Sequence, residues 1–209
     1  MRFIAGSSLV FSIILCLFAG CASHYRLIQP PVLSYSSAEV IDSVSFCYKY
    51  NILSESGNRK YARKERKEHL KIVAIKIVNN SHTTLSLKDN LQLFAVEKPI
   101  TLIENKDFYG ETNQSPASYI LYLILTPVHQ FSINLYGNSK VFPFGYILAP
   151  LLVTRNMIVA AKANKDYRYE LRRYDLSDLK IPPDETVFGI IGFEAVDNIP
   201  LTIKRKFRK

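Results

Sequence analysis

The residue types that most often do chemistry are few in this chain and are poorly spaced for catalysis. The 209-residue sequence has four His and three Cys, and no two of them stand in an HExxH or CxxC arrangement of the kind that metal sites use. A Gly-x-Ser-x-Gly elbow and a Walker loop are also missing from the sequence. The residues in question are His24, His69, His82, His129, Cys16, Cys21 and Cys47.

Four carboxylates, Asp175, Asp178, Asp184 and Glu185, cluster around a predicted turn. Paired carboxylates can hydrolyse glycosides, but only at a defined separation, and closeness in the sequence at a turn does not set that separation. We therefore predict no catalytic residue, no metal site and no cofactor, and we expect the protein not to be an enzyme.

Cys21 is the thiol with the most distinctive surroundings. It follows a basic start and an apolar run, Phe3–Phe18, which is shorter than the ~20 residues of a membrane span and ends in small residues like a cleavable signal. The sequence Leu17-Phe18-Ala19-Gly20-Cys21 resembles a bacterial lipobox, where signal peptidase II cuts before a cysteine that carries lipid. Ala19, Gly20 and Cys21 match this pattern, while Phe18 stands where Leu, Val or Ile is usual.

This resemblance implies that residues 1–20 are a signal peptide, that Ala19 and Gly20 form the peptidase site, and that Cys21 is lipidated. Cys47 would then be the last remaining thiol, and the monomer would form no disulfide. The alternative is an ordinary signal cleaved near Ala19 or Ser23, which leaves a Cys21–Cys47 bridge possible.

Lipidation would also set the location of the protein. Two or three acyl chains hold a protein on a membrane far better than one. Ala22 stands where Asp would retain a Gram-negative lipoprotein at the inner membrane, so the resemblance implies an outer-membrane lipoprotein that faces the periplasm. Residues 21–42 contain Pro30-Pro31 and a Ser-rich stretch, and we expect them to form a flexible tether.

The expected folded body, 43–209, begins with strand patterns. Residues 43–52 alternate apolar and polar side chains, and residues 70–78 are apolar on both faces, as in a central strand. Turns recur about every ten residues, which favours an antiparallel sandwich. Further strands are predicted at 83–87, 91–96, 100–103, 186–194 and 201–207.

Two segments, Ile72–Ser81 and Ile181–Gly189, resemble the immunoglobulin-like domains of bacterial envelope lipoproteins. The first reads as a strand followed by an Asn-rich turn, and the second as a Pro-acidic-Thr turn followed by a strand with Gly. The resemblance implies a mainly β fold with some α, an immunoglobulin-like antiparallel β-sandwich. A binding or assembly role is usual for such modules, and the resemblance carries over no catalytic residue.

A partly helical apolar insertion is expected at about 105–180. Two runs in it, 119–128 and 141–153, are almost entirely apolar, but each meets a polar or helix-breaking residue before it reaches spanning length. We therefore predict no transmembrane helix. The runs are either buried or form an apolar hairpin, 119–153, that meets the membrane interface or another protein. From Asn156 to Tyr174 the apolar spacing predicts a helix with its cations facing outward.

The formal charge of +9 is concentrated in two clusters. Export makes nucleic acid an implausible partner, so we expect no nucleic-acid binding. The clusters are either solvated or contact anionic lipid or lipopolysaccharide, where each cation contributes ~1 kcal/mol. They comprise Arg59, Lys60, Arg63, Lys64, Arg66 and Lys67 in the first cluster, and Lys204, Arg205 and Lys206 in the second.

Taken together, these patterns favour a non-catalytic, lipid-anchored envelope protein. Its partners would be the membrane, through the anchor, and another envelope protein for which it acts as an interaction or assembly module. The alternative is a protein that binds lipid or the membrane interface through 119–153 and the basic clusters.

Overall fold

The computed structural model describes residues 21–35, 37–133 and 139–206. The expected signal peptide, with Ala19 and Gly20, lies outside these residues. The chain divides into two compact units. Within the described residues, the helical unit consists of 21–24 and 114–163, and the sheet unit consists of 25–113 and 164–206.

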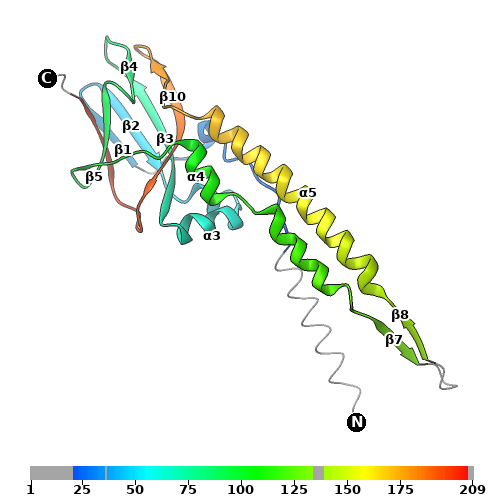
Figure 1. Ribbon diagram of the computed structural model, residues 1–209. Helices are drawn as coiled ribbons and strands as arrows, with labels where there is room; N and C mark the ends of the chain where they lie inside the picture. The colour runs from blue at the N-terminus through cyan, green and yellow to red at the C-terminus, as the bar shows by residue number, and fades with distance from the viewer. Residues whose placement is uncertain (1–20, 36, 134–138, 207–209) are drawn as a thin grey trace. The chain divides into compact units, whose positions relative to one another are not determined.

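The main sheet of the sheet unit is four-stranded and antiparallel, in the order β1-β2-β3-β10 (Figure 1). Alternation explains β2, because Val44 and Phe46 are buried whereas Ser45 and Cys47 are half-buried. The predicted central strand β3 does lie in the interior of this sheet. The strands are β1 (Ser37–Ile41), β2 (Val44–Lys49), β3 (Leu70–Asn79) and β10 (Thr186–Glu194).

A second sheet has the order β11-β5-β6, and two further strands, β4 and β9, form a short pair. Phe46, Ile75 and Ile77 of the main sheet belong to the same apolar cluster as Leu93 and Ile203 of the second sheet. The two sheets therefore share one core. These strands are β4 (Leu85–Ser86), β5 (Leu91–Ala95), β6 (Lys98–Pro99), β9 (Lys180–Ile181) and β11 (Leu201–Arg205).

Strand β1 lies in the segment that we expected to be a tether. It pairs with β2 through a two-residue loop, Asp42-Ser43, whose φ angles are 48° and 64°. Positive φ at both loop positions is the requirement of a type I′ hairpin, whose twist matches that of the flanking strands. The chain therefore joins the sheet from Ser37 onward, after a single 3₁₀ turn, η1 (Pro30–Val32).

Three short helices complete the sheet unit together with the end of α5. The basic segment forms α3, which buries Tyr61, Ala62 and Glu65 and turns its cations outward. Gly192 of β10 leaves room for the ring of Phe108 in α4, where a Cβ would collide. The helices are α2 (Ile52–Glu55), α3 (Arg59–Lys67), α4 (Asn105–Thr112) and α5 (Phe144–Arg173).

The helical unit pairs a ten-residue 3₁₀ helix, η2 (Pro116–Leu125), with the first part of α5. The N–H of Gly145 donates to the carbonyl of Val128 at 2.8 Å, which brings the start of α5 to the chain that follows η2. Between them lies a hairpin of β7 (Gln130–Ile133) and β8 (Ser139–Phe142) (Figure 1).

Pro150 is a helix-breaking residue of the second apolar run, 141–153, and the expectation that such a residue interrupts the run is wrong. A single helix of 30 residues, α5, runs through this proline, even though proline removes one backbone donor. An 18-residue window of α5 has a mean hydropathy of 1.5, so the helix is long and apolar enough to cross a membrane. Buried core helices pass the same test, but only 22% of this window is buried.

The fold is a mixed α/β fold with antiparallel sheets, and its described residues hold more helix than the mainly β class that we expected. Strands β5 and β10 follow the predicted ranges closely. The strand predicted at 83–87 shrinks to β4, and the one at 100–103 retains a single bridge, Ile103 to Gly192.

Candidate functional site

Cys21, the predicted lipidation residue, lies at the start of the described chain and is half-buried. The residues after it pack within the helical unit. The N–H of Ala22 donates to Oδ1 of Asn156 at 2.7 Å, and Ser23 exchanges two hydrogen bonds with the side chain of Gln114, at 3.2 and 2.7 Å. Cys21 and Cys47 are not joined by a disulfide in this structure.

The segment after Ser23 is docked on the sheet unit, in contrast to the flexible tether that we expected. Glu170 of α5 accepts the N–H of Ile28 at 2.9 Å and the N–H of Gln29 at 2.8 Å, and it also accepts the hydroxyl of Tyr25 at 2.6 Å. Burial and the nearby Glu170 carboxylate raise the pKa of Tyr25. The carboxylate thus satisfies backbone donors that a free segment would leave to water.

The ring of Tyr25 is held by two other tyrosines of the sheet unit. Its centroid lies 5.4 Å from that of Tyr61 and 5.1 Å from that of Tyr167. Tyr61 and Tyr167 are fully buried. A buried aromatic ring contributes a large apolar area as well as these ring contacts, so the segment is anchored by packing as well as by hydrogen bonds.

The apolar runs of the helical unit are largely exposed, which argues against the alternative in which both runs are buried and favours the apolar hairpin. Leu121 of η2 is 77% exposed and Ile124 is 80% exposed, while Leu151 of α5 is 62% exposed. Large exposed apolar patches on monomers mark protein or membrane contacts. Other exposed apolar residues of the unit are Ile120, Leu123, Val128, Val141, Phe142, Phe144, Tyr146, Ile147 and Ile158.

The residues that α5 buries within the helical unit are small instead. Gly145, Ala149, Asn156 and Ala160 are buried. Large apolar residues outside and small ones inside are the reverse of a soluble helix and are typical of helices packed in lipid. Charge is also depleted here, because Lys140 is the one Asp, Glu, Lys or Arg in residues 112–154. This depletion could have been read from the sequence.

The first predicted basic cluster forms the outer face of α3. Arg59, Arg63 and Arg66 are exposed, as is Lys67, which pairs with Glu68 at 3.0 Å. Lys60 and Lys64 are half-buried. The helix therefore presents a dense positive surface to solvent.

The second predicted basic cluster lies at the end of β11. Lys204 sits over the ring of Phe94 at 5.0 Å, Arg205 is half-buried, and Lys206 donates to the carbonyl of Lys88 at 2.6 Å. The structure does not join the two clusters, because α3 packs beside β3 and α4 whereas β11 pairs with β5 (Figure 1).

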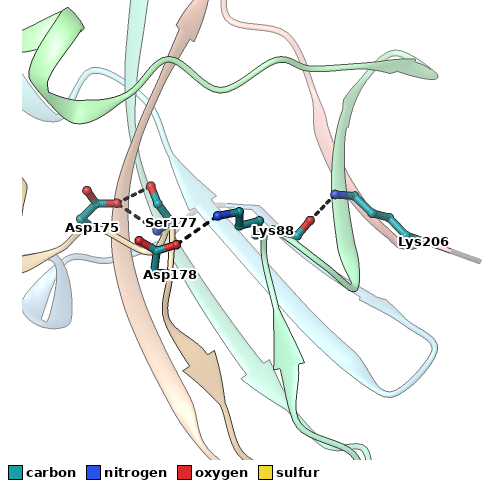
Figure 2. Close-up of polar contacts among 5 residues, drawn as sticks. All are labelled: Lys88, Asp175, Ser177, Asp178 and Lys206. Atoms are coloured by element: carbon teal, nitrogen blue, oxygen red, sulfur yellow. Dashed lines mark hydrogen bonds and ion pairs between the residues drawn. The ribbon is translucent and has the colours of Figure 1, made fainter. Parts of the chain in front are cut away.

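An open cleft of about 610 Å³ lies in the sheet unit, between α4, the last turns of α5 and two loops. Figure 2 shows part of its wall. Nζ of Lys88 lies 3.4 Å from Oδ1 of Asp178, and Oδ1 of Asp175 accepts the N–H and the hydroxyl of Ser177 at 2.9 and 2.6 Å. Its residues come from three separate stretches of sequence, 87–88, 102–109 and 168–178, so no local pattern could have predicted it.

The other candidate residues do not assemble into a catalytic or metal site. Asp175 and Asp178 line the cleft, but each has the partner given above, and Asp184 and Glu185 are exposed at the turn before β10. His129 is exposed, and its ring contacts the carbonyl of Pro127. Among the residues that the structure describes, no three His, Cys, Asp or Glu side chains gather as they would around a metal ion.

Comparisons of the chain with protein-family models, curated proteins and solved structures gave no match.

Proposed function

We propose that this chain is a lipid-anchored envelope protein whose helical unit lies against the membrane that holds its lipid. The proposed anchor is a lipid on Cys21, and the proposed location is the periplasmic face of the outer membrane. The observation that carries the proposal is the inverted packing of α5 in the helical unit, where large apolar residues are exposed and Gly145, Ala149 and Ala160 are buried.

The position of Cys21 supports the same proposal. Ala22 and Ser23 are hydrogen-bonded to Asn156 and Gln114, which lie close to the two ends of the charge-depleted stretch, 112–154. A lipid on Cys21 would therefore begin where the apolar surface begins. An apolar protein surface beside the lipid would add a second attachment to that of the acyl chains.

The hairpin of β7 and β8 favours an orientation along the membrane over one across it. The helix from Phe144 to Asn156 is ~18 Å long, whereas the hydrocarbon core is ~30 Å thick. An upright helix would carry the hairpin to the middle of the bilayer. Within the described residues, this hairpin is a two-stranded sheet with open edges, and unpaired backbone groups in hydrocarbon cost several kcal/mol each. We therefore assign the unit to the interface.

The basic face of α3 would add attraction to anionic headgroups, as would the cations at 204–206. Each cation near a charged membrane contributes ~1 kcal/mol and is screened by salt. Co-sedimentation with anionic vesicles should therefore weaken as salt rises and as Arg63 and Lys67 are replaced by Gln. Binding that is indifferent to both changes would remove the basic clusters from the proposal.

In a competing proposal, another envelope protein binds the exposed apolar surface, and this chain acts as an assembly module. The shared core of the two antiparallel sheets supports an immunoglobulin-like sandwich, an architecture that usually serves binding. The two proposals differ in what covers the exposed apolar surface. In the first it is the membrane, and no protein partner is needed; in the second it is another protein.

The absence of tryptophan from the chain provides the discriminating experiment. A single Trp replaces Leu151 in the lipidated full-length protein, which is reconstituted into vesicles whose lipids carry bromine at defined depths. We expect its fluorescence to shift to the blue and to be quenched most by bromine near the headgroups.

Val40→Trp is the matched control, because Val40 is 70% exposed on β1 of the sheet unit. We expect its fluorescence to be unquenched. Equal and negligible quenching at both positions would refute the membrane contact and leave the assembly proposal. Metabolic acyl labelling of wild type against Cys21→Ala tests the anchor separately, since label retained by the variant would exclude Cys21 as its site.

A further inference from the structure

The open cleft of the sheet unit carries two guanidinium groups with no carboxylate beside them. Arg168 and Arg172 are four residues apart on α5, so their side chains lie on one face of the helix, and both line the cleft. Within the described residues, no Asp or Glu oxygen lies within 4.0 Å of either guanidinium.

The carboxylates that share the cleft are already engaged by other groups. Glu104 pairs with Lys106 at 2.7 Å, and Asp178 pairs with Lys88 at 3.4 Å. Asp175 is held by the N–H and hydroxyl of its own turn, as Figure 2 shows. The cations that line the cleft outnumber its carboxylates, four to three, and the two guanidiniums of its α5 wall form no ion pair with the carboxylates.

The same wall is partly ordered and partly apolar. The guanidinium of Arg168 lies 5.7 Å from the centre of the Tyr109 ring, an arrangement that holds a cation in place without neutralising it. Leu102 is 36% exposed and gives the cleft its accessible apolar surface, while Leu87 and Leu171, which also line the cleft, are almost fully buried. Guanidinium groups beside apolar side chains suit a ligand that has both a charged group and an apolar part.

We propose that this cleft binds a small ligand that carries an oxyanion, a carboxylate or a phosphate, on an apolar body. The planar forks of Arg168 and Arg172 match the paired oxygens of such a group and bind it through charge-assisted hydrogen bonds. The apolar body contacts the exposed side chain of Leu102. A volume of about 610 Å³ is within the range of small-molecule sites. This site does not depend on the membrane proposal, because all of its residues belong to the sheet unit.

Calorimetric titration of the purified full-length protein tests the site with three probes. Phenyl phosphate and benzoate each carry an oxyanion on an aromatic body, and benzyl alcohol has a similar body without charge. We expect one or both anions to bind and benzyl alcohol not to bind, and the tighter of the two anions identifies the preferred head group. Benzyl alcohol binding as tightly as the anions would overturn the role assigned to charge.

The double variant Arg168→Gln/Arg172→Gln removes both guanidinium groups. Loss of charge-assisted hydrogen bonds should weaken anion binding at least about tenfold. Arg173→Gln is the matched control, since Arg173 is exposed on the same helix and lies over Tyr174 outside the cleft. We expect it to bind as wild type does.

Equal affinity in wild type and the double variant would overturn the proposal, as would no anion binding to wild type. A second measurement uses wild type alone. Rising salt should weaken the binding of phenyl phosphate, and binding that is indifferent to salt would also contradict the assignment. Circular dichroism establishes that each variant is folded.

Discussion

Glu65 is a buried carboxyl group whose ionisation should control how the stability of the sheet unit depends on pH. It lies on the inner face of α3, and Oε1 accepts the N–H of Ile72 at 2.8 Å. The pairing of β3 with β2 ends at Ala74, so Ile72, two residues earlier in β3, has no partner in β2. The carboxyl group of Glu65 accepts the N–H of Ile72 in place of that strand. Burial raises the pKa of Glu65 to about 7, although the Ile72 hydrogen bond acts in the opposite direction.

The magnitude follows from the difference between the folded and unfolded states. A pKa of about 7 against the ordinary 4.5, at about 1.4 kcal/mol per pKa unit, corresponds to roughly 3 kcal/mol. The folded state holds the proton more tightly, so it binds more protons than the unfolded state between these two values. Stability from this group is therefore present in full below 4.5 and is lost as pH rises through 7.

Glu65→Gln keeps an oxygen that can accept from Ile72 but removes the ionisation. We expect wild type to lose roughly 2.5 kcal/mol of unfolding free energy between pH 5 and pH 8 through this group, and the variant to lose little. Urea unfolding followed by circular dichroism at both pH values measures the difference.

The control for this comparison is Glu111→Gln, which alters an exposed carboxyl group in α4 and should retain the pH dependence of wild type. Parallel losses of stability in wild type and Glu65→Gln would refute the reasoning, because they would show that the buried carboxyl group does not cause the pH dependence.

Three other substitutions test the packing that positions the sites. Glu170→Ala leaves two backbone N–H groups of the docked segment without their acceptor, which should cost ~2–4 kcal/mol and speed tryptic cleavage after Arg26; cleavage at the wild-type rate would contradict the docking. Gly192→Ala places a methyl group against the ring of Phe108, and we expect ~1–3 kcal/mol of destabilisation in urea unfolding. Asn79→Ala removes an amide that donates to three carbonyls; we expect a loss of ~2 kcal/mol, and an unchanged urea midpoint would argue against it.

The spacing of apolar and charged residues predicted those elements whose buried and exposed faces can be read from the element's own residues. β3 is apolar on both faces and lies inside the main sheet, and the outward cations of the helix after Asn156 are exposed. Local reasoning failed at Pro150, where a helix continues, and at β1, which has no strong alternation and depends on the type I′ turn that follows it. In both places the surrounding structure outweighs the local preference.

The sequence by itself determined the candidate lipidation residue, the charge-depleted stretch and the core strands, because each depends on residues that are adjacent or regularly spaced. Only the tertiary structure decided that the chain after Cys21 is docked, since its backbone donors find their acceptor, Glu170, 142 residues away from Ile28. The same is true of the cleft, whose cations and carboxylates come from distant segments. The pairing among those side chains leaves the guanidiniums of Arg168 and Arg172 without a carboxylate partner, and no single stretch of sequence contains that information.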